Sequence, residues 1–91
     1  MKFTIEIGHK EKHQLQYQFN QLLGRLVIKI DNQLVKESVR LFNEPVLEVH
    51  VLLIGESEKS AVRIEKQRKA LFGQRNRLYV NDRLAEVFDG V

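Results

Sequence analysis

The most regular feature of the chain is an alternation of apolar and polar residues, with the period of two that is typical of half-buried β-strands. The alternation covers residues 3–7 and, without a fault, residues 14–19, where Leu15, Tyr17 and Phe19 share one face and glutamines occupy the other. A strand of this kind turns its apolar face to the core and its polar face to water or to a partner. We therefore predict a strand in each segment, with a glutamine face that is either solvated or an oligomer contact.

The longest apolar-rich run covers residues 46–54 and is predicted to be a central strand of a sheet. Apolar residues occupy alternate positions of this run and therefore share one face of the predicted strand. Glu48 and His50 occupy the other face, where we expect them to form a cross-strand polar pair or to lie at the surface. Gly55 and the polar residues after it end the run.

One pattern occurs twice in the chain. In both copies two large apolar residues and a glycine precede a strand-like run, an Asx pair and a leucine. The Asx pairs are Asp31-Asn32 and Asn81-Asp82, and both residue types tolerate the positive φ angles that a type I′ turn requires. The repeat therefore predicts two matched β-hairpins, one in each of two related halves of the chain.

Two segments leave the fold class open, because residues 33–42 and 58–72 also contain helix signals. Ser57 is placed to cap the second helix and Gly73 to end it, but five consecutive polar residues would leave that helix a ragged apolar face. The repeat favours strands, because the second hairpin's returning arm is too short for a packed helix. We predict an all-β fold, an antiparallel β-sandwich of about eight strands built from two related hairpin halves. The alternative is an α+β fold with helices near 33–42 and 58–72.

The length and composition are those of a small globular domain. The 91 residues are expected to form a single β-sandwich domain, residues 1–91, around one core. The chain has no cysteine, so disulfides and thiolate metal sites are excluded. It has no apolar run as long as a membrane helix and no apolar stretch of signal-peptide type near residue 1. We therefore expect a cytoplasmic protein without a membrane partner.

Positive charge is concentrated in the last third of the chain. The formal net charge is +3; residues 1–58 contain seven Lys and Arg against eight Asp and Glu, whereas residues 59–91 contain eight against four. The possible partner-binding basic patch consists of Arg63, Lys66, Arg68, Lys69, Arg75 and Arg77. Such a cluster can bind an acidic protein or, with an aromatic ring such as Tyr79 nearby, a single-stranded nucleic acid. It can also be a solvated edge whose charges prevent edge-to-edge pairing of sheets.

No combination of residues predicts catalysis or metal binding. His9 and His13 flank the only segment rich in metal-ligand residue types, but on an extended backbone they lie about 13 Å apart, so we expect a solvated turn. The carboxylates of Asp31 and Asp82 occupy turn positions, where they are expected to bond to their own backbone. The chain has no nucleophile elbow, P-loop or dinucleotide-binding motif. We therefore predict a protein that is not an enzyme and has no cofactor.

Several short motifs follow one another in a recognisable order. They are His13-Gln14-Leu15 leading to Gly24, the hairpins at Ile30-Asp31-Asn32 and Val80-Asn81-Asp82, and Val62-Arg63-Ile64-Glu65 leading to Leu71-Phe72-Gly73. In this arrangement, over residues 3–88, the chain resembles the β-sandwich domain of the Fas apoptotic inhibitory molecule family. It departs from the family where Asn32 and Asp82 replace the turn glycine, although both residue types enter the αL region at modest cost.

The resemblance implies an eight-stranded antiparallel sandwich that is not an enzyme and that acts by binding other proteins. It implies no particular site residues. Our hypothesis from the sequence is a small non-enzymatic protein-interaction or regulatory β-domain with an unknown protein partner. The alternative is a basic β-domain that binds single-stranded nucleic acid through the basic patch.

Overall fold

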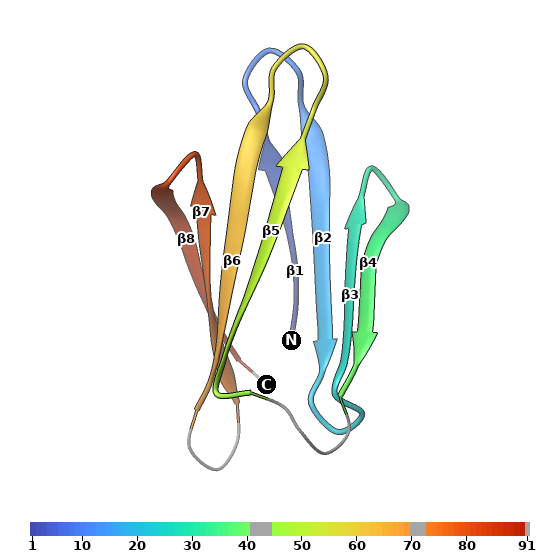
Figure 1. Ribbon diagram of the computed structural model, residues 1–91, viewed down its shortest axis with the longest axis vertical. Helices are drawn as coiled ribbons and strands as arrows, with labels where there is room; N and C mark the ends of the chain where they lie inside the picture. Colours follow the sequence, from blue (N-terminus) through green and yellow to red (C-terminus); the bar gives the residue numbers. More distant parts are fainter. Residues whose placement is uncertain (41–44, 70–72, 91) are drawn as a thin grey trace.

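The computed structural model describes residues 1–40, 45–69 and 73–90 and shows two four-stranded antiparallel sheets packed together (Figure 1). In each sheet the strands lie side by side in chain order. Sheet A contains β1 (Lys2–Ile7), β2 (His13–Asn20), β3 (Arg25–Ile30) and β4 (Gln33–Val39). Sheet B contains β5 (Leu47–Ile54), β6 (Ser60–Arg68), β7 (Gln74–Val80) and β8 (Arg83–Gly90). The predicted all-β sandwich of eight strands is confirmed.

The α+β alternative is wrong for the described residues, because both segments with helix signals contain strands. Residues 33–39 form β4, and residues 60–68 form β6. Residues 41–42 and 70–72, which complete the two segments, lie outside the described residues. In the part of the chain that the structure describes, no helix is long and apolar enough to cross a membrane.

The two sheets follow the same plan, as the sequence repeat predicted. The first hairpin of sheet A, β1–β2, matches the first hairpin of sheet B, β5–β6, at an offset of 47 residues in sequence. This offset relates Ile7, at the end of β1, to Ile54, at the end of β5. The second hairpins, β3–β4 and β7–β8, match at an offset of 50 residues. Each contains one β-bulge, which follows Ile28 in the first case and Leu78 in the second. We call two positions equivalent when these offsets relate them.

The tight turns of the second hairpins have the predicted backbone. Asp31 and Asn32 have φ angles of 51° and 66°, and Asn81 and Asp82 have angles of 50° and 65°, as a type I′ turn requires. We expected the carboxylate of Asp31 to bond to the backbone of its own turn. Instead it accepts the N–H of Gln14 on β2, at 2.8 Å. The side chain of Asn81 makes the equivalent bond to the backbone of β6, at 2.9 Å. The turn side chains therefore fix each hairpin to the preceding one.

The hydrophobic core lies between the sheets. On β1 the ring of Phe3 is stacked between Tyr17 and Phe88, at centroid distances of 4.6 and 3.8 Å, and so joins both sheets. Aromatic stacking of this kind adds to the free energy of apolar burial. The buried apolar side chains are Phe3, Ile7, Leu15, Tyr17, Phe19, Leu26, Ile28, Ile54, Val62, Ile64 and Leu78.

The inner face of sheet B contains buried polar side chains where the equivalent positions of sheet A are mostly apolar. They are His50, Lys66, Gln74 and Asn76, each at most 2% exposed. The ammonium of Lys66 lies 3.7 Å from the centroid of the Phe19 ring, a cation–π contact between the sheets. We call these four residues the polar inner cluster.

Candidate functional site

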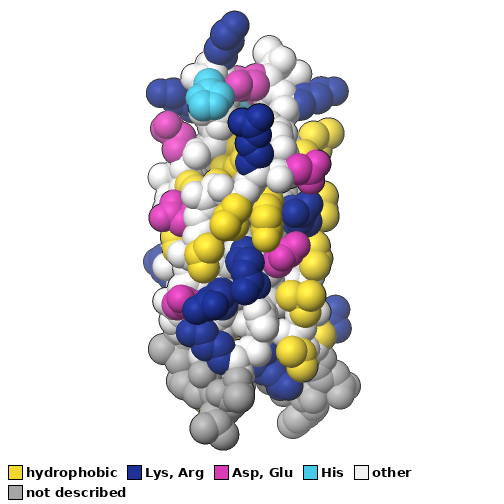
Figure 2. Space-filling model, turned by 90° about the vertical axis from the view of Figure 1, so that its left-hand side faces the viewer, with side chains coloured by type: hydrophobic (Ala, Val, Ile, Leu, Met, Phe, Trp, Pro, Cys, Tyr) yellow, Lys and Arg dark blue, Asp and Glu magenta, His cyan; other side chains and the backbone are white. Residues whose placement is uncertain are grey.

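The most unusual surface of the molecule belongs to β5. Its outward side chains are Leu47, Val49, Val51 and Leu53, which we call the β5 stripe. They are 54%, 46%, 69% and 69% exposed. Figure 2, seen from the side on which β7 and β8 lie in Figure 1, shows hydrophobic side chains in a vertical row along one margin of the molecule. A contiguous exposed apolar patch of this kind is often a contact surface, whereas single apolar residues scattered over a surface are ordinary.

The prediction that residues 46–54 form a central strand is therefore wrong. β5 lies at the edge of sheet B, and among the strands that the structure describes β6 alone is its neighbour in the sheet. The apolar face points outward because the opposite face is fixed in the interior, where Ile54 is buried and Leu52 packs against the core. Since successive side chains of a strand point to opposite faces, the β5 stripe must face the solvent.

The polar residues of β5 also have partners on the inner side. Glu48 Oε1 lies 2.8 Å from His50 Nε2, and Glu48 Oε2 lies 2.9 Å from Nε of Arg40, which follows β4. Burial lowers the pKa of His50, and the positive charges of Lys36 and Lys66 lower it further, against the opposing effect of Glu48. The expectation of a cross-strand or surface position is therefore wrong: Glu48 and His50 pair within one strand, and they lie between the sheets, where His50 is 2% exposed.

The β5 stripe also differs from the outward faces of the other three edge strands. β1 carries Lys2 and Glu6 there, β4 carries Glu37, and β8 carries Asp89. Outward charges of this kind discourage a sheet edge from pairing with another chain. Among the edge strands that the structure describes, β5 alone has no charged residue on its outward face.

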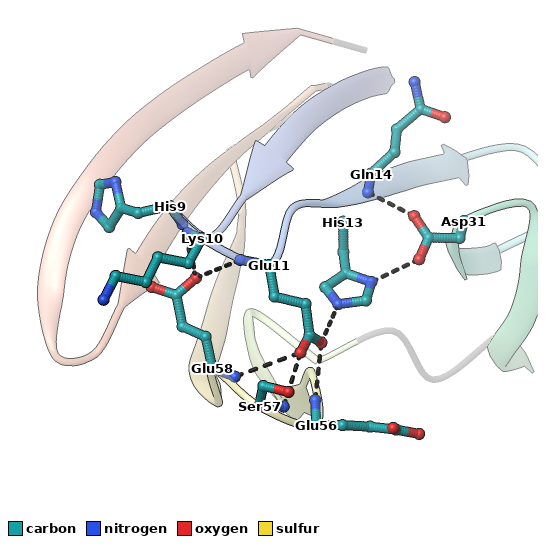
Figure 3. A network of polar contacts seen from close by, with 9 residues as sticks. All are labelled: His9, Lys10, Glu11, His13, Gln14, Asp31, Glu56, Ser57 and Glu58. Atoms are coloured by element: carbon teal, nitrogen blue, oxygen red, sulfur yellow. Dashed lines mark hydrogen bonds and ion pairs between the residues drawn. The ribbon is translucent and has the colours of Figure 1, made fainter.

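A polar clasp joins the β1–β2 loop to the β5–β6 loop, at the end of the molecule where both loops lie (Figures 1 and 3). Glu58 Oε1 accepts the N–H groups of His9, Lys10 and Glu11, at 2.8, 2.9 and 3.0 Å. Glu11 makes the reciprocal bonds to the loop of Glu58, with three N–H donors at 2.8, 2.7 and 3.3 Å. We call this arrangement of loops 8–12 and 55–59 the glutamate clasp. It fixes the first hairpins of the two sheets to each other.

His13 extends the glutamate clasp to the turn of the second hairpin in sheet A. Its Nε2 lies 2.5 Å from Glu11 Oε2, and its Nδ1 lies 2.6 Å from Asp31 Oδ2 (Figure 3). The bonds to Asp31 and then Glu11 raise the pKa of His13. The bond from His13, followed by those from the backbone of the opposite loop, lowers the pKa of Glu11 to about 2.

The expected solvated turn at residues 9–13 is thus only part of what the structure shows. His9 is exposed, whereas Glu11 and His13 are held by hydrogen bonds. Both ring nitrogens of His13 already face carboxylates, and no group of three or more His, Asp or Glu within the described ranges is placed to hold a metal ion.

Sequence reasoning missed the glutamate clasp, although a signal for it was present. Both loops read Gly-x-x-Glu-Lys, in residues 8–12 and 55–59, at the offset of 47. Gly8 and Gly55 both have a φ of 102°, and a Cβ at either position would collide with the backbone oxygen of the glutamate three residues on. The glycine makes the tight loop possible, and the glutamate reaches the other loop.

The structure divides the predicted basic patch between the surface and the interior. Lys66 is buried, because β6 alternates strictly and places it on the inner face with Val62 and Ile64. The outward members on β6 and β7 are Arg63, Arg75 and Arg77. Arg68 and Lys69 are exposed where β6 ends.

Acidic neighbours balance much of the exposed basic charge. Arg75 Nε lies 2.7 Å from Asp89 Oδ1, and Arg63 Nη1 lies 2.9 Å from Asp82 Oδ1. The pKa of Arg63 is raised, and its bond to Asp82 is the largest cause. The guanidinium of Arg63 also lies over the ring of Tyr79, 4.2 Å from the ring centroid. The aromatic ring that we considered as a stacking platform for bases is therefore already in contact with an arginine.

Comparisons of the chain with models of protein families, with curated proteins and with solved structures found no match. The choice of a candidate site accordingly depends on the geometry of this chain. By that criterion the β5 stripe, on an open sheet edge, is the candidate functional site. The glutamate clasp holds the loop that follows β5.

Proposed function

We propose that this protein is a small, non-enzymatic protein-interaction module of the cytoplasm that binds through β5. The observation that carries the proposal is the β5 stripe, four apolar side chains facing outward on the edge strand without an outward charge. Folded domains rarely keep such an edge open without a use, because it invites pairing with other chains.

The physical mode of binding is strand addition. The free edge of β5 offers backbone N–H and C=O groups to a partner strand, and these bonds give affinity that depends little on sequence. The β5 stripe selects partners with apolar residues at alternate positions, which pack beside Val49 and Val51. The resemblance to the Fas apoptotic inhibitory molecule family, whose members bind other proteins, agrees with this class of function.

The nucleic-acid hypothesis has less support. Within the described residues, Tyr79 is the aromatic side chain on the outer face of sheet B, and Arg63 covers it. The adjacent Arg75 is paired with Asp89. A titration with a single-stranded oligonucleotide at two salt concentrations tests the alternative, since binding driven by phosphate contacts is strongest at low salt.

Affinity capture with matched variants tests the main proposal. We expect the wild-type protein and the Val39→Lys variant to retain the same proteins, and the Val51→Lys variant to lose them, because lysine places a charge in the middle of the β5 stripe. Val39 is a suitable control, since it is 58% exposed and faces outward on the edge strand β4. If the Val51→Lys variant captures the same proteins as wild type, β5 is not the binding surface.

A further inference from the structure

We infer that the strand that best fits β5 is β5 of a second copy of this chain, in an antiparallel pair that joins the two B sheets into one sheet of eight strands. The inference depends on the proposed function, because it names the occupant of the same edge. A two-fold axis would pass through the pair, so that each copy contributes the same surface.

The first argument is that β5 is complementary to itself. In an antiparallel pair centred on Val51, the outward neighbour of Val49 is Leu53 of the second copy, and only apolar side chains meet on this face. On the inner face, Glu48 would stand opposite Ile54 of the second copy, and His50 opposite Leu52. No two like charges come together in this register, and the lateral contact of the two stripes covers part of the apolar surface that either copy alone exposes.

The second argument concerns the choice between a second copy and a foreign strand. Complementary charges commonly decide which partner a protein selects. The outward face of β5 has no charge by which to attract or to reject a particular foreign strand. The edge of another copy matches it in length, in apolar period and in the absence of charge.

Size determines how strong this association is. The outward side chains of β5 are 46–69% exposed and expose on the order of 400 Å² per copy. Edge-to-edge pairing leaves the outer face of the joined sheet in solvent, so the pair covers only the part of this area that faces the second copy. A standard stable interface covers about 800 Å² per partner. We therefore expect a weak, concentration-dependent dimer.

Sedimentation equilibrium between about 10 μM and about 1 mM protein tests the inference. The wild-type protein is expected to pass from monomer toward dimer over this range. The Val51→Lys variant should have a dissociation constant at least about tenfold higher, whereas Val39→Lys should behave as wild type. Far-UV circular dichroism checks that both variants have the strand content of the wild type, and a Lys29→Glu variant on the outer face of β3 serves as a second charge-changing control.

The absence of cysteine allows a direct test of the register. In the pair centred on Val51, a Val51→Cys variant places two thiols beside the two-fold axis, within reach of a disulfide. Under mild oxidation it should form a covalent dimer much faster than the Val39→Cys variant.

A wild-type protein that stays monomeric at the highest concentration overturns the inference. So does a dimer that the Val51→Lys variant leaves intact, or a Val51→Cys variant that oxidises no faster than its control. If the monomeric protein still captures other proteins through Val51, the proposed function stands and only the second copy as partner is wrong. If the protein dimerises through β5 but captures nothing, the inference stands and the binding of other proteins fails.

Discussion

β1 and β5 begin the two halves of the chain and occupy the same place at the edge of their sheets, yet they expose opposite kinds of residue. The outward positions of β1 hold Lys2, Thr4 and Glu6. The equivalent positions of β5 hold Val49, Val51 and Leu53. An edge with outward charge is protected from pairing, and an edge without it is open to pairing. The comparison shows that the β1 edge carries the outward charges that prevent pairing and that the β5 edge lacks them, as the proposed binding through β5 requires.

The inner positions of the two strands differ in the reverse sense. Phe3 of β1 is equivalent to His50 of β5, and on the neighbouring strands Phe19 is equivalent to Lys66. The two halves keep the same registers, bulges and turns in spite of these exchanges. The fold therefore depends on strand period, turn chemistry and the glutamate clasp more than on an apolar residue at each inner position.

The largest expected effect comes from truncating the equivalent residues Phe3 and His50. The Phe3→Ala variant should lose about 3–5 kcal/mol of unfolding free energy, because it leaves a cavity between Tyr17 and Phe88. The His50→Ala variant should lose less, about 1–2 kcal/mol, because the desolvation cost of the imidazole disappears with it and Glu48 keeps its ion pair with Arg40. Urea denaturation measures both, and equal losses would contradict the difference that we describe between the halves.

A smaller effect is expected from the glutamate clasp. The Glu58→Gln and Glu11→Gln variants should both melt lower than wild type, by roughly 5 °C, because an amide oxygen is a weaker acceptor than a carboxylate. Glu11→Gln should have the larger effect, since Glu11 also bonds to His13. Thermal melts at neutral pH measure the shifts. The control is Glu6→Gln, which affects only the exposed ion pair with Lys12; a similar shift there would show that the clasp is no stronger than a surface pair.

The two histidines should give stability a pH dependence of opposite sign. The pKa of His13 is raised above its ordinary value of 6.5, so its contribution is complete below that pH and is lost as the pH rises through the raised pKa. The pKa of His50 is lowered, so the unfolded chain takes up this proton first and stability falls as the pH drops below 6.5.

The corresponding variants separate these effects. His13→Gln should destabilise the protein more at about pH 6 than at about pH 9, and His50→Gln should be relatively less harmful at about pH 5 than at about pH 7.5. Urea denaturation at these four pH values is the measurement. If both variants respond to pH in the same direction, the environments that we assign to the two side chains are not those of the protein in solution.

The smallest effect on stability is expected where β1 is made more like β5. The Thr4→Val variant should change the unfolding free energy by less than about 0.5 kcal/mol, because the site is exposed. It should not create a new contact surface, since Lys2 and Glu6 still flank it. Sedimentation velocity measures association. Self-association of this variant through β1 would show that outward charge is not what separates the two edges.

The strands and turns could be predicted from the sequence because their causes are local. The alternation around Tyr17 and the Asx pair at Asp31 determine backbone conformation within a few residues, and the structure confirms both. The orientation of β5 could not be predicted in this way. Alternation defines the two faces of a strand but not which of them faces the core, because that depends on contacts with the opposite sheet. In β5 one such contact is the ion pair between Glu48 and Arg40, which follows β4 in sheet A.

The candidate site shows the same limit. The alternation of β6 was sufficient to place Lys66 inside with Ile64, yet the basic residues looked like one cluster because they are neighbours in sequence. The glutamate clasp was visible only as a repeated motif, because each carboxylate bonds to a loop more than 40 residues away. The periodicity of a single strand does not predict contacts between segments that are distant in the sequence.

The glutamate clasp also bears on how long the folded protein lasts. Its bonds between the loops join residues 45 to 49 positions apart, and neither carboxylate has its backbone N–H donors until both hairpin loops are formed. Contacts of such separation come late in folding, after local hairpins have closed. An interaction that is absent from the folding transition state slows unfolding and leaves the folding rate almost unchanged. We therefore expect the two glutamates to set the lifetime of the folded chain, while the type I′ turns set the speed with which it forms.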